Sequence, residues 1–218
     1  MDIVSAVSTR FYRAKLMLRF YYIQRIRGFD APTEPHLEDE AGHWLQQQLR
    51  ETNRFVEFGS GGSTVLAASL GVPTTSVESD HFYADTVRKA LDGAGSVQIV
   101  VPRMGLTYEW GMPVFFPARK GLRYVTAPFA ENGEEDFPDF IMVDGRYRVA
   151  CALESARRAH QAGSTAKLLV DDYFGRENYY ILEEYIGAPV PIGRAALFVI
   201  GQNPIEKEAV ERYARDPR

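Results

Sequence analysis

Short apolar runs and longer amphipathic stretches alternate along most of the chain, and this alternation predicts the fold. The apolar runs end in glycines or acids, as buried parallel strands often do, and the stretches between them carry apolar residues three or four positions apart, as helices do. The runs predict strands at residues 54–58, 74–77, 97–101, 140–143, 167–170, near 190, and 195–200. Strands and helices in this order indicate an α/β fold, with a mostly parallel sheet covered by helices on both faces.

The first 50 residues precede this pattern. Apolar residues at helical spacing predict a helix over residues 1–27, and the breaker-rich residues 28–35 predict a linker to a second helix over residues 36–50. The first helix is basic, with Arg10, Arg13, Lys15, Arg19, Arg25 and Arg27. We therefore expect an N-terminal helical extension over residues 1–50 and one ligand-binding domain over residues 51–218.

The basic helix allows two interpretations. It could lie on an anionic membrane surface or against an acidic partner, as cationic amphipathic helices do. It could also pack over the domain or against a second subunit, with its basic face in water. We favour packing over membrane contact, and the sequence leaves the oligomeric state open.

Composition narrows the function classes. The formal net charge of −4 gives no overall attraction to nucleic acid, so we expect no nucleic-acid partner. A single cysteine, Cys151, excludes an internal disulfide framework and fits a reducing compartment. Apolar runs are too short to span a bilayer, and arginines interrupt any secretory signal, so the expected location is the cytoplasm.

The turn after the first strand carries the clearest chemical signal. Its residues are Glu57, Phe58, Gly59, Ser60, Gly61, Gly62, Ser63 and Thr64. Glycines let a ligand approach the backbone closely, and the free amides of the next helix start favour an anionic group. Glu78, followed by Ser79, comes 19 residues after Gly59 at the end of the second strand, where a carboxylate can accept hydrogen bonds from a ribose diol.

Two cofactor classes fit a glycine turn followed by an acid. The dinucleotide fingerprint requires a third glycine for helix packing, and Thr64 stands there. Glu57 would also crowd a pyrophosphate, whereas it suits a sulfonium nucleoside. At this point residues 54–201 resemble the class I S-adenosylmethionine-dependent methyltransferases, whose first motif is an acid, an apolar residue and Gly-x-Gly. The resemblance implies a Rossmann-like, doubly wound sheet of seven strands, mostly parallel, with an antiparallel last strand.

The resemblance also assigns the cofactor-binding residues. It implies that Gly59, Gly61 and Ser63 surround the methionyl part, that Glu78 holds the ribose, and that Ser60, Thr64 and Ser79 complete the site with Glu57. Many relatives have an acid after the third strand that contacts the adenine. This chain has Val101, Pro102 and Arg103 there, which leaves the adenine contact unassigned.

Acids end the fourth and fifth strands on the same predicted rim. They are Asp144, Asp171 and Asp172, which we expect to be catalytic. Such a set suits Mg²⁺, and the pattern is similar to that of the metal-dependent O-methyltransferases, so the three acids are also candidate metal ligands. Relatives often have a base soon after the fourth-strand acid, but this chain has Arg146 and Arg148. These would bind an anionic small-molecule substrate, or would pair with the acids in place of a metal.

Residues 102–139 break the strand-helix rhythm, with many aromatic side chains and no firm helix predicted. A loop of that length is usually functional or disordered. Trp110 would sit at the tip of a lid over the substrate, or the aromatic side chains would pack the loop against the domain.

The expected function is methyl transfer to an oxygen of a small molecule. The alternatives are a non-catalytic methyltransferase-like nucleoside-binding protein and an NAD(P)-dependent oxidoreductase.

Overall fold

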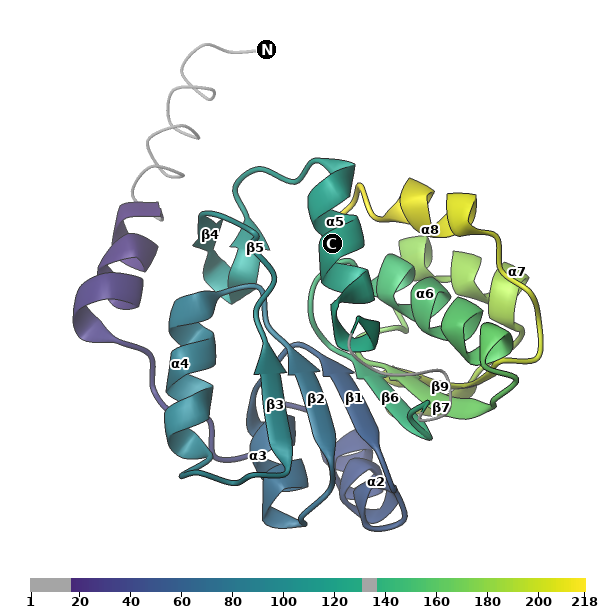
Figure 1. The fold of residues 1–218 in the computed structure, drawn as a ribbon, viewed down its shortest axis with the longest axis horizontal. Helices are drawn as coiled ribbons and strands as arrows, with labels where there is room; N and C mark the ends of the chain where they lie inside the picture. The colour runs from purple at the N-terminus through teal and green to yellow at the C-terminus, as the bar shows by residue number, and fades with distance from the viewer. Residues whose placement is uncertain (1–16, 131–136) are drawn as a thin grey trace.

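A single twisted sheet forms the centre of the protein. The structure is a computed structural model that describes residues 17–130 and 137–218, so the prediction for residues 1–16 lies outside the described residues. Figure 1 shows the sheet between two layers of helices. Its strands are β1 (Phe55–Phe58), β2 (Thr74–Val77), β3 (Val97–Val100), β6 (Phe140–Val143), β7 (Ala166–Val170), β8 (Val190–Ile192) and β9 (Ala195–Ile200).

The strand order is β3-β2-β1-β6-β7-β9-β8 in a seven-stranded sheet. Strands β1, β2, β3, β6 and β7 pair in parallel, whereas β9 pairs antiparallel with both β7 and β8. The predicted Rossmann-like sheet with an antiparallel last strand is confirmed. The order reverses between β1 and β6, so the carboxyl ends of these two strands form the crevice where ligands bind in open α/β sheets.

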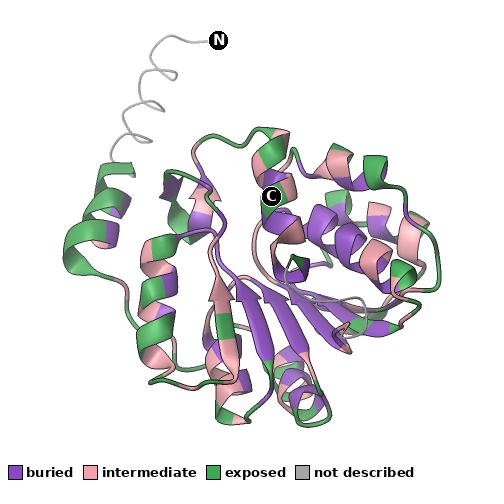
Figure 2. Cartoon of the chain, in the orientation of Figure 1, coloured by how far each residue is buried: buried purple, intermediate pink, exposed green. Residues whose placement is uncertain are grey.

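Helices cover both faces of the sheet. They are α2 (Asp39–Arg50), α3 (Gly62–Ser69), α4 (His81–Ala90), α5 (Ala118–Thr126), α6 (Arg148–Gln161), α7 (Ile181–Ile186) and α8 (Lys207–Tyr213). Residues on one face of β1, such as Val56 and Phe58, join the core under α5, α6 and α8, and Phe55 on the other face joins the core under α2 and α3. The central strands are therefore buried on both faces (Figure 2).

The described part of the N-terminal extension packs onto the domain. Residues 17–27 are helical and end in the π-helical turn η1 (Ile23–Arg27). Gln24 is buried there, and its amide donates to Asp80 Oδ2 at 2.6 Å and to Thr107 Oγ1 at 3.0 Å. Asp80 also caps α4 by accepting from the amide of Phe82 at 2.9 Å. Helix η1 is thereby fixed to α4 and to the segment that follows β3.

The prediction of no firm helix between residues 102 and 139 is wrong. The segment contains a hairpin of β4 (Thr107–Tyr108) and β5 (Met112–Pro113), joined by the turn η2 (Glu109–Gly111), and then α5 and the short helix η3 (Ala127–Phe129). Helix α5 is short, but its buried residues Gly121, Tyr124 and Val125 lie on one face. Glycines and prolines nearby hid that short periodicity.

No helix in the described residues is long and apolar enough to cross a membrane.

Candidate functional site

The turns after β1 and β6 touch at the switch point of the sheet. Gly59 has a φ of +103°, and a Cβ on it would lie 2.8 Å from the backbone nitrogen of Gly145. The amide of Asp144 donates to the carbonyl of Phe58 at 2.9 Å. The backbone of Glu34 also crosses the start of α3, so closely that a Cβ on Gly62 would collide with its carbonyl. The glycine turn is therefore walled by β6 and by residues of the N-terminal linker.

Glu57 lies behind this turn and holds it to α3. Its Oε2 accepts from the hydroxyl of Ser63 at 2.6 Å, and its Oε1 accepts from the hydroxyl of Thr64. Thr64 Oγ1 in turn accepts from the amide of Gly61 at 2.8 Å. Burial raises the pKa of Glu57 from 4.5 to about 7, against the lowering effect of these hydroxyl donors. Glu57, Ser63 and Thr64 thus form a buried support with their polar atoms already paired.

Glu78 is placed at the carboxyl end of β2, as predicted. Its Oε1 accepts from the amide of Asp80 at 2.8 Å and from the hydroxyl of Ser79 at 3.1 Å. Burial raises the pKa of Glu78 from 4.5 to about 7, and the nearby charge of Asp80 adds to the rise. Both of these hydrogen bonds end on Oε1.

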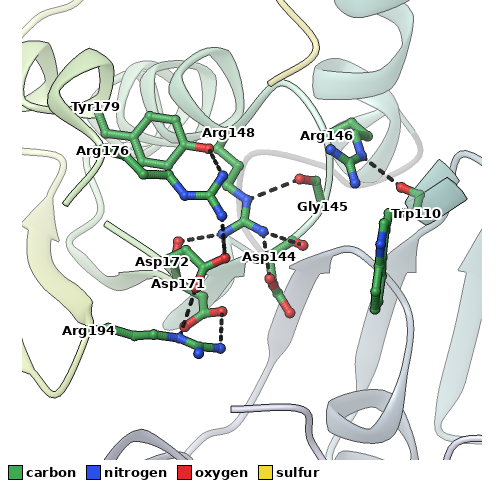
Figure 3. A network of polar contacts seen from close by, with 10 residues as sticks. All are labelled: Trp110, Asp144, Gly145, Arg146, Arg148, Asp171, Asp172, Arg176, Tyr179 and Arg194. Atoms are coloured by element: carbon green, nitrogen blue, oxygen red, sulfur yellow. Dashed lines mark hydrogen bonds and ion pairs between the residues drawn. The ribbon is translucent and has the colours of Figure 1, made fainter. Parts of the chain in front are cut away.

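The hairpin turn of the long insertion closes over this strand end. Ser79 Oγ donates to the carbonyl of Gly111 at 2.8 Å, and Arg146 Nε donates to the carbonyl of Trp110 at 2.7 Å. Trp110 has a φ of +60°, and its side chain is 77% exposed. The position predicted as a lid tip is therefore a turn fixed at two points to the rim, and Figure 3 shows one of them, the bond from Arg146 to Trp110.

Tyr83 is a member of the site that the sequence analysis missed. Its hydroxyl oxygen lies 3.7 Å from the position of a Cβ on Gly61. Burial raises the pKa of Tyr83 to about 12, and the charges of Glu78, Glu57 and Asp144 add to the rise. Tyr83 sits in an amphipathic helix with the spacing of a core residue, so only the proximity of its hydroxyl to the glycine turn distinguishes it.

Asp144 lies beside Arg148 on the β6 side of the site. Arg148 Nη2 is 2.9 Å from Asp144 Oδ1, and the same guanidinium donates to the carbonyls of Gly145, Asp144 and Asp171. Arg148 is buried, with 9% of its side chain exposed, whereas the Asp144 side chain is 32% exposed. Arg148 therefore ties the ends of β6 and β7 together, and Asp144 faces the rim (Figure 3).

The acids after β7 are held by further arginines. Asp172 lies 2.8 Å from Arg194 Nε and 2.6 Å from Arg176 Nη2. Asp171 is buried, with its Oδ2 3.6 Å from Arg194 and its Oδ1 without a hydrogen-bond partner in the described residues. Arg194, which lies just before β9, carried no recognisable signal in the sequence, because it is far from both acids along the chain.

Asp144 has the properties of a group that titrates near neutrality. Burial raises its pKa from 3.8 to about 7, Arg148 opposes the rise, and the charges of Asp171 and Asp172 add to it. Although burial is the largest cause, about a third of the side chain stays exposed, so water or a ligand can reach the carboxyl.

The expected magnesium site at Asp144, Asp171 and Asp172 is not supported. Within residues 17–130 and 137–218, no group of three or more histidine, cysteine, aspartate or glutamate side chains is arranged to hold a metal. The physical reason is that Arg148, Arg176 and Arg194 bind the carboxylate oxygens that a cation would need. The donor set suits guanidinium groups, which was the alternative left open by the sequence.

The predicted residues therefore divide into two groups. Gly59, Gly61, Glu78, Trp110 and Asp144 border one rim, with Arg146 between the last two. Ser60 is buried, with its hydroxyl 2.6 Å from that of Ser76. The second group is buried, and its polar contacts lie mainly inside the protein; its members are Ser60, Glu57, Ser63, Thr64, Arg148 and Asp171.

Among the described residues, a cavity of about 270 Å³ lies elsewhere, between β2, β3 and η3, and contains none of these groups.

Comparison with proteins of known structure finds methyltransferase-like relatives. A methyltransferase-like protein from Silicibacter pomeroyi is 35% identical, with a TM-score of 0.75, over 85% of this chain and 99% of that protein. A putative O-methyltransferase from Klebsiella pneumoniae is 18% identical over 96% of this chain and 81% of its own, with a TM-score of 0.45. A putative caffeoyl-CoA O-methyltransferase from Staphylococcus aureus is 13% identical over 91% and 99%, with a TM-score of 0.48. No protein-family model and no curated protein matches the sequence.

Proposed function

Because the chain belongs to the class I S-adenosylmethionine-dependent methyltransferase-like proteins, we propose that it transfers a methyl group from S-adenosylmethionine to an oxygen of a small anionic acceptor. The cofactor supplies an electrophilic methyl group on its sulfonium. The protein then has to orient the acceptor oxygen and take its proton. The observation that carries the proposal is the Asp144 carboxyl, which is partly exposed at the switch point and has its pKa raised to about 7.

The glycine turn and Glu78 fit the cofactor. Gly59 and Gly61 present bare backbone at the crevice, and the nearest atom to a Cβ on Gly61 is the Tyr83 hydroxyl oxygen at 3.7 Å. In this proposal the carboxylate of Glu78 accepts hydrogen bonds from ribose hydroxyls. An NAD(P)-dependent oxidoreductase has less support, because Thr64 replaces the glycine that dinucleotide binding requires and its hydroxyl is tied to Glu57.

Asp144 acts as the general base in this proposal. A base is most effective when its pKa lies near the working pH, and burial brings the carboxyl of Asp144 there. Arg148 fixes its orientation through the 2.9 Å contact to Oδ1. Asp171 and Asp172 are positioning residues, since their contacts to arginines hold the β7 end in place and their charges help raise the pKa of Asp144.

Arg146 selects an anionic acceptor. Its Nε donates to Trp110, and neither Nη atom has a partner among the described residues. Burial and the nearby Arg148 lower the pKa of Arg146, so an anion that neutralises it is favoured. A guanidinium whose two Nη groups are free matches a carboxylate or phosphate in a bidentate pair. We therefore expect hydroxy acids, phenolic acids or phosphorylated alcohols as acceptors.

Calorimetry and methyl transfer test the proposal together. We expect S-adenosylhomocysteine to bind while NAD and NADP do not, and labelled methyl to reach at least one acid in a panel of hydroxylated anions. Asp144→Asn should keep nucleoside binding but lower transfer about 10²- to 10⁴-fold, the usual contribution of a general base. Asp85→Asn, in an exposed ion pair with Arg88, is the matched control. Full transfer by Asp144→Asn would contradict the assignment, and binding of NAD alone would overturn the cofactor class.

A non-catalytic nucleoside-binding protein is the second candidate. The contact of Arg148 with Asp144 favours it, because an ion pair weakens the carboxylate as a base. It predicts tight binding of S-adenosylhomocysteine with no labelled product from any acceptor in the panel. A pH profile separates the two candidates, since only the enzyme gives a transfer rate that rises as Asp144 ionises near pH 7.

A further inference from the structure

Two segments that meet beside the site hold most of the exposed apolar side chains. Residues 17–27 form the helix that ends in η1, and residues 102–123 run from the end of β3 into α5. They contain ten of the fourteen exposed large hydrophobic residues in the described part of the chain. These ten are Met17, Leu18, Tyr21, Tyr22, Ile26, Leu106, Tyr108, Trp110, Phe115 and Phe116. We call the exposed side chains of residues 17–27 and 102–123 the basic aromatic surface.

The two segments are joined by hydrogen bonds. Gln24 in the first donates to Thr107 Oγ1 in the second at 3.0 Å. Lys120 Nζ donates to the carbonyls of Met104 and Phe115, which holds the loop before α5 to the loop after β3. Figure 1 shows the helix and the β4–β5 hairpin along the same side of the molecule. The two segments that carry the exposed apolar side chains are therefore joined to each other.

This region is also strongly cationic. Its two segments carry seven basic residues and one acid, Glu109, although the whole chain has a net charge of −4. The basic residues are Arg19, Arg25, Arg27, Arg103, Arg119, Lys120 and Arg123. Among the described residues, one of the seven is in an ion pair, Arg27 with the exposed Asp30. The charge is thus concentrated where the apolar side chains are exposed.

We propose that the basic aromatic surface binds an anionic phospholipid bilayer. Aromatic and aliphatic side chains enter the boundary between headgroups and acyl chains, and arginine and lysine reach the lipid phosphates from the same surface. The packing of Arg25 over the rings of Tyr21 and Phe82, at 4.2 and 4.9 Å, keeps its charge beside an apolar side chain. Each basic residue near an anionic membrane contributes about 1 kcal/mol, about fivefold in affinity.

Charge distinguishes a bilayer from a second copy of the chain. A symmetric dimer would place this surface against itself, and the same cations would face one another. An anionic bilayer instead neutralises them. Exposed apolar side chains gathered on neighbouring segments mark interaction sites, and an anionic lipid surface is a partner with complementary charge. The proposal does not depend on methyl transfer, because it uses no group from the glycine turn or from the end of β6. Of the residues at the rim, it uses only the exposed ring of Trp110.

Vesicle co-sedimentation of the full chain tests this inference. The probes are phosphatidylcholine vesicles with and without about one third phosphatidylserine. We expect binding to the anionic vesicles alone, and its loss in high salt, which screens surface charge. Binding equal to both vesicles, or to neither, would overturn the proposal.

Matched variants locate the surface. Arg19→Glu with Arg119→Glu should weaken binding to anionic vesicles at least tenfold, and Ile26→Ser with Phe115→Ser should weaken it comparably. Arg212→Glu and Val190→Ser change exposed residues of α8 and β8 and should bind as wild type. Circular dichroism confirms that each variant is folded. Unchanged binding by both surface variants would refute the location, and a concentration-dependent dimer abolished by the same variants would assign the surface to a second copy instead.

Discussion

Gly59 after β1 and Gly145 after β6 lie so close that a Cβ on the first would be 2.8 Å from the amide nitrogen of the second. Real Cβ atoms essentially never approach a backbone atom this closely, and Gly59 also has a φ of +103°, which side chains disfavour. The two turns that form the crevice therefore fix one another. Neither turn can move to admit a side chain without displacing the end of the neighbouring strand.

This contact predicts a large effect of Gly59→Ala. Gly71→Ala is the matched control, because Gly71 also has a positive φ, +71°, but a Cβ on it meets no atom within 4 Å. The free energy of unfolding of the control should fall by about 1–2 kcal/mol, from backbone strain alone. The free energy of unfolding of Gly59→Ala should fall further, and this variant should also no longer bind S-adenosylhomocysteine. Urea unfolding and calorimetry measure both effects, and equal stability of the two variants would contradict the close approach.

Glu57 predicts how stability depends on pH. Its folded pKa of about 7 lies above the ordinary value of 4.5, so the folded state binds a proton more tightly than the unfolded state does. Glu57 therefore destabilises the fold progressively as pH rises from about 4 to 7, by roughly 3 kcal/mol at most, and has no further effect above its folded pKa. Glu57→Gln should remove this dependence.

The comparison requires urea unfolding of wild type and Glu57→Gln from pH 5 to 8. Differences between the two proteins isolate Glu57, because Glu78 and Asp144 titrate in both. Relative to the variant, wild type should lose free energy of unfolding up to pH 7 and then stay parallel to it. Parallel curves throughout the range would mean that the carboxyl of Glu57 ionises normally.

Local sequence signals were enough to predict the sheet and the positions of the turns. Strand β6 is a continuous apolar run and β1 is apolar except for Glu57, and an acid or a glycine follows each strand at once. Glu78 and Asp144 were found for the same reason, since each is the first residue after a strand. Parallel strands end at one rim, so these groups had to lie near one another.

Contacts between distant segments could not be predicted. The sequence did not indicate that Arg194 reaches Asp171 and Asp172, or that Glu34 crosses Gly62. Helix α5 was missed because its nine residues lie among glycines and prolines, where periodicity is weak. The metal hypothesis found no support for a related reason, because carboxylates at strand ends suit a cation or a guanidinium equally well until the partners are known.

Glu78 makes a prediction about nucleoside binding. Glu78→Gln keeps an oxygen for the amide of Asp80 but removes the negative charge that ribose hydroxyls would meet. Since hydrogen bonds to charged groups contribute about 1.5–3 kcal/mol, affinity for S-adenosylhomocysteine should fall about tenfold or more. Glu109→Gln, an exposed acid in the neighbouring hairpin turn, is the control. Calorimetry that gave wild-type affinity for Glu78→Gln would remove Glu78 from the ribose site.

Arg146 makes the last prediction, which concerns the hairpin turn over the rim. Its Nε bond of 2.7 Å to Trp110 and the Ser79 bond to Gly111 fix this turn. In a Trp44→Phe background Trp110 is the remaining tryptophan, so its fluorescence anisotropy reports the turn alone. Arg146→Met should lower the anisotropy, because one of the two fixing bonds is lost while the exposed ring stays in water.

Arg212→Met, an exposed arginine on α8, should leave the Trp110 signal unchanged. If Arg146 also receives the acceptor, adding a hydroxy acid that is methylated should raise the anisotropy further in wild type but not in Arg146→Met. Arg146→Lys separates the two roles, since it keeps the charge but loses the bidentate geometry. Unchanged anisotropy in Arg146→Met would mean that the Ser79 bond alone holds the turn, and the role of Arg146 would then be limited to the acceptor.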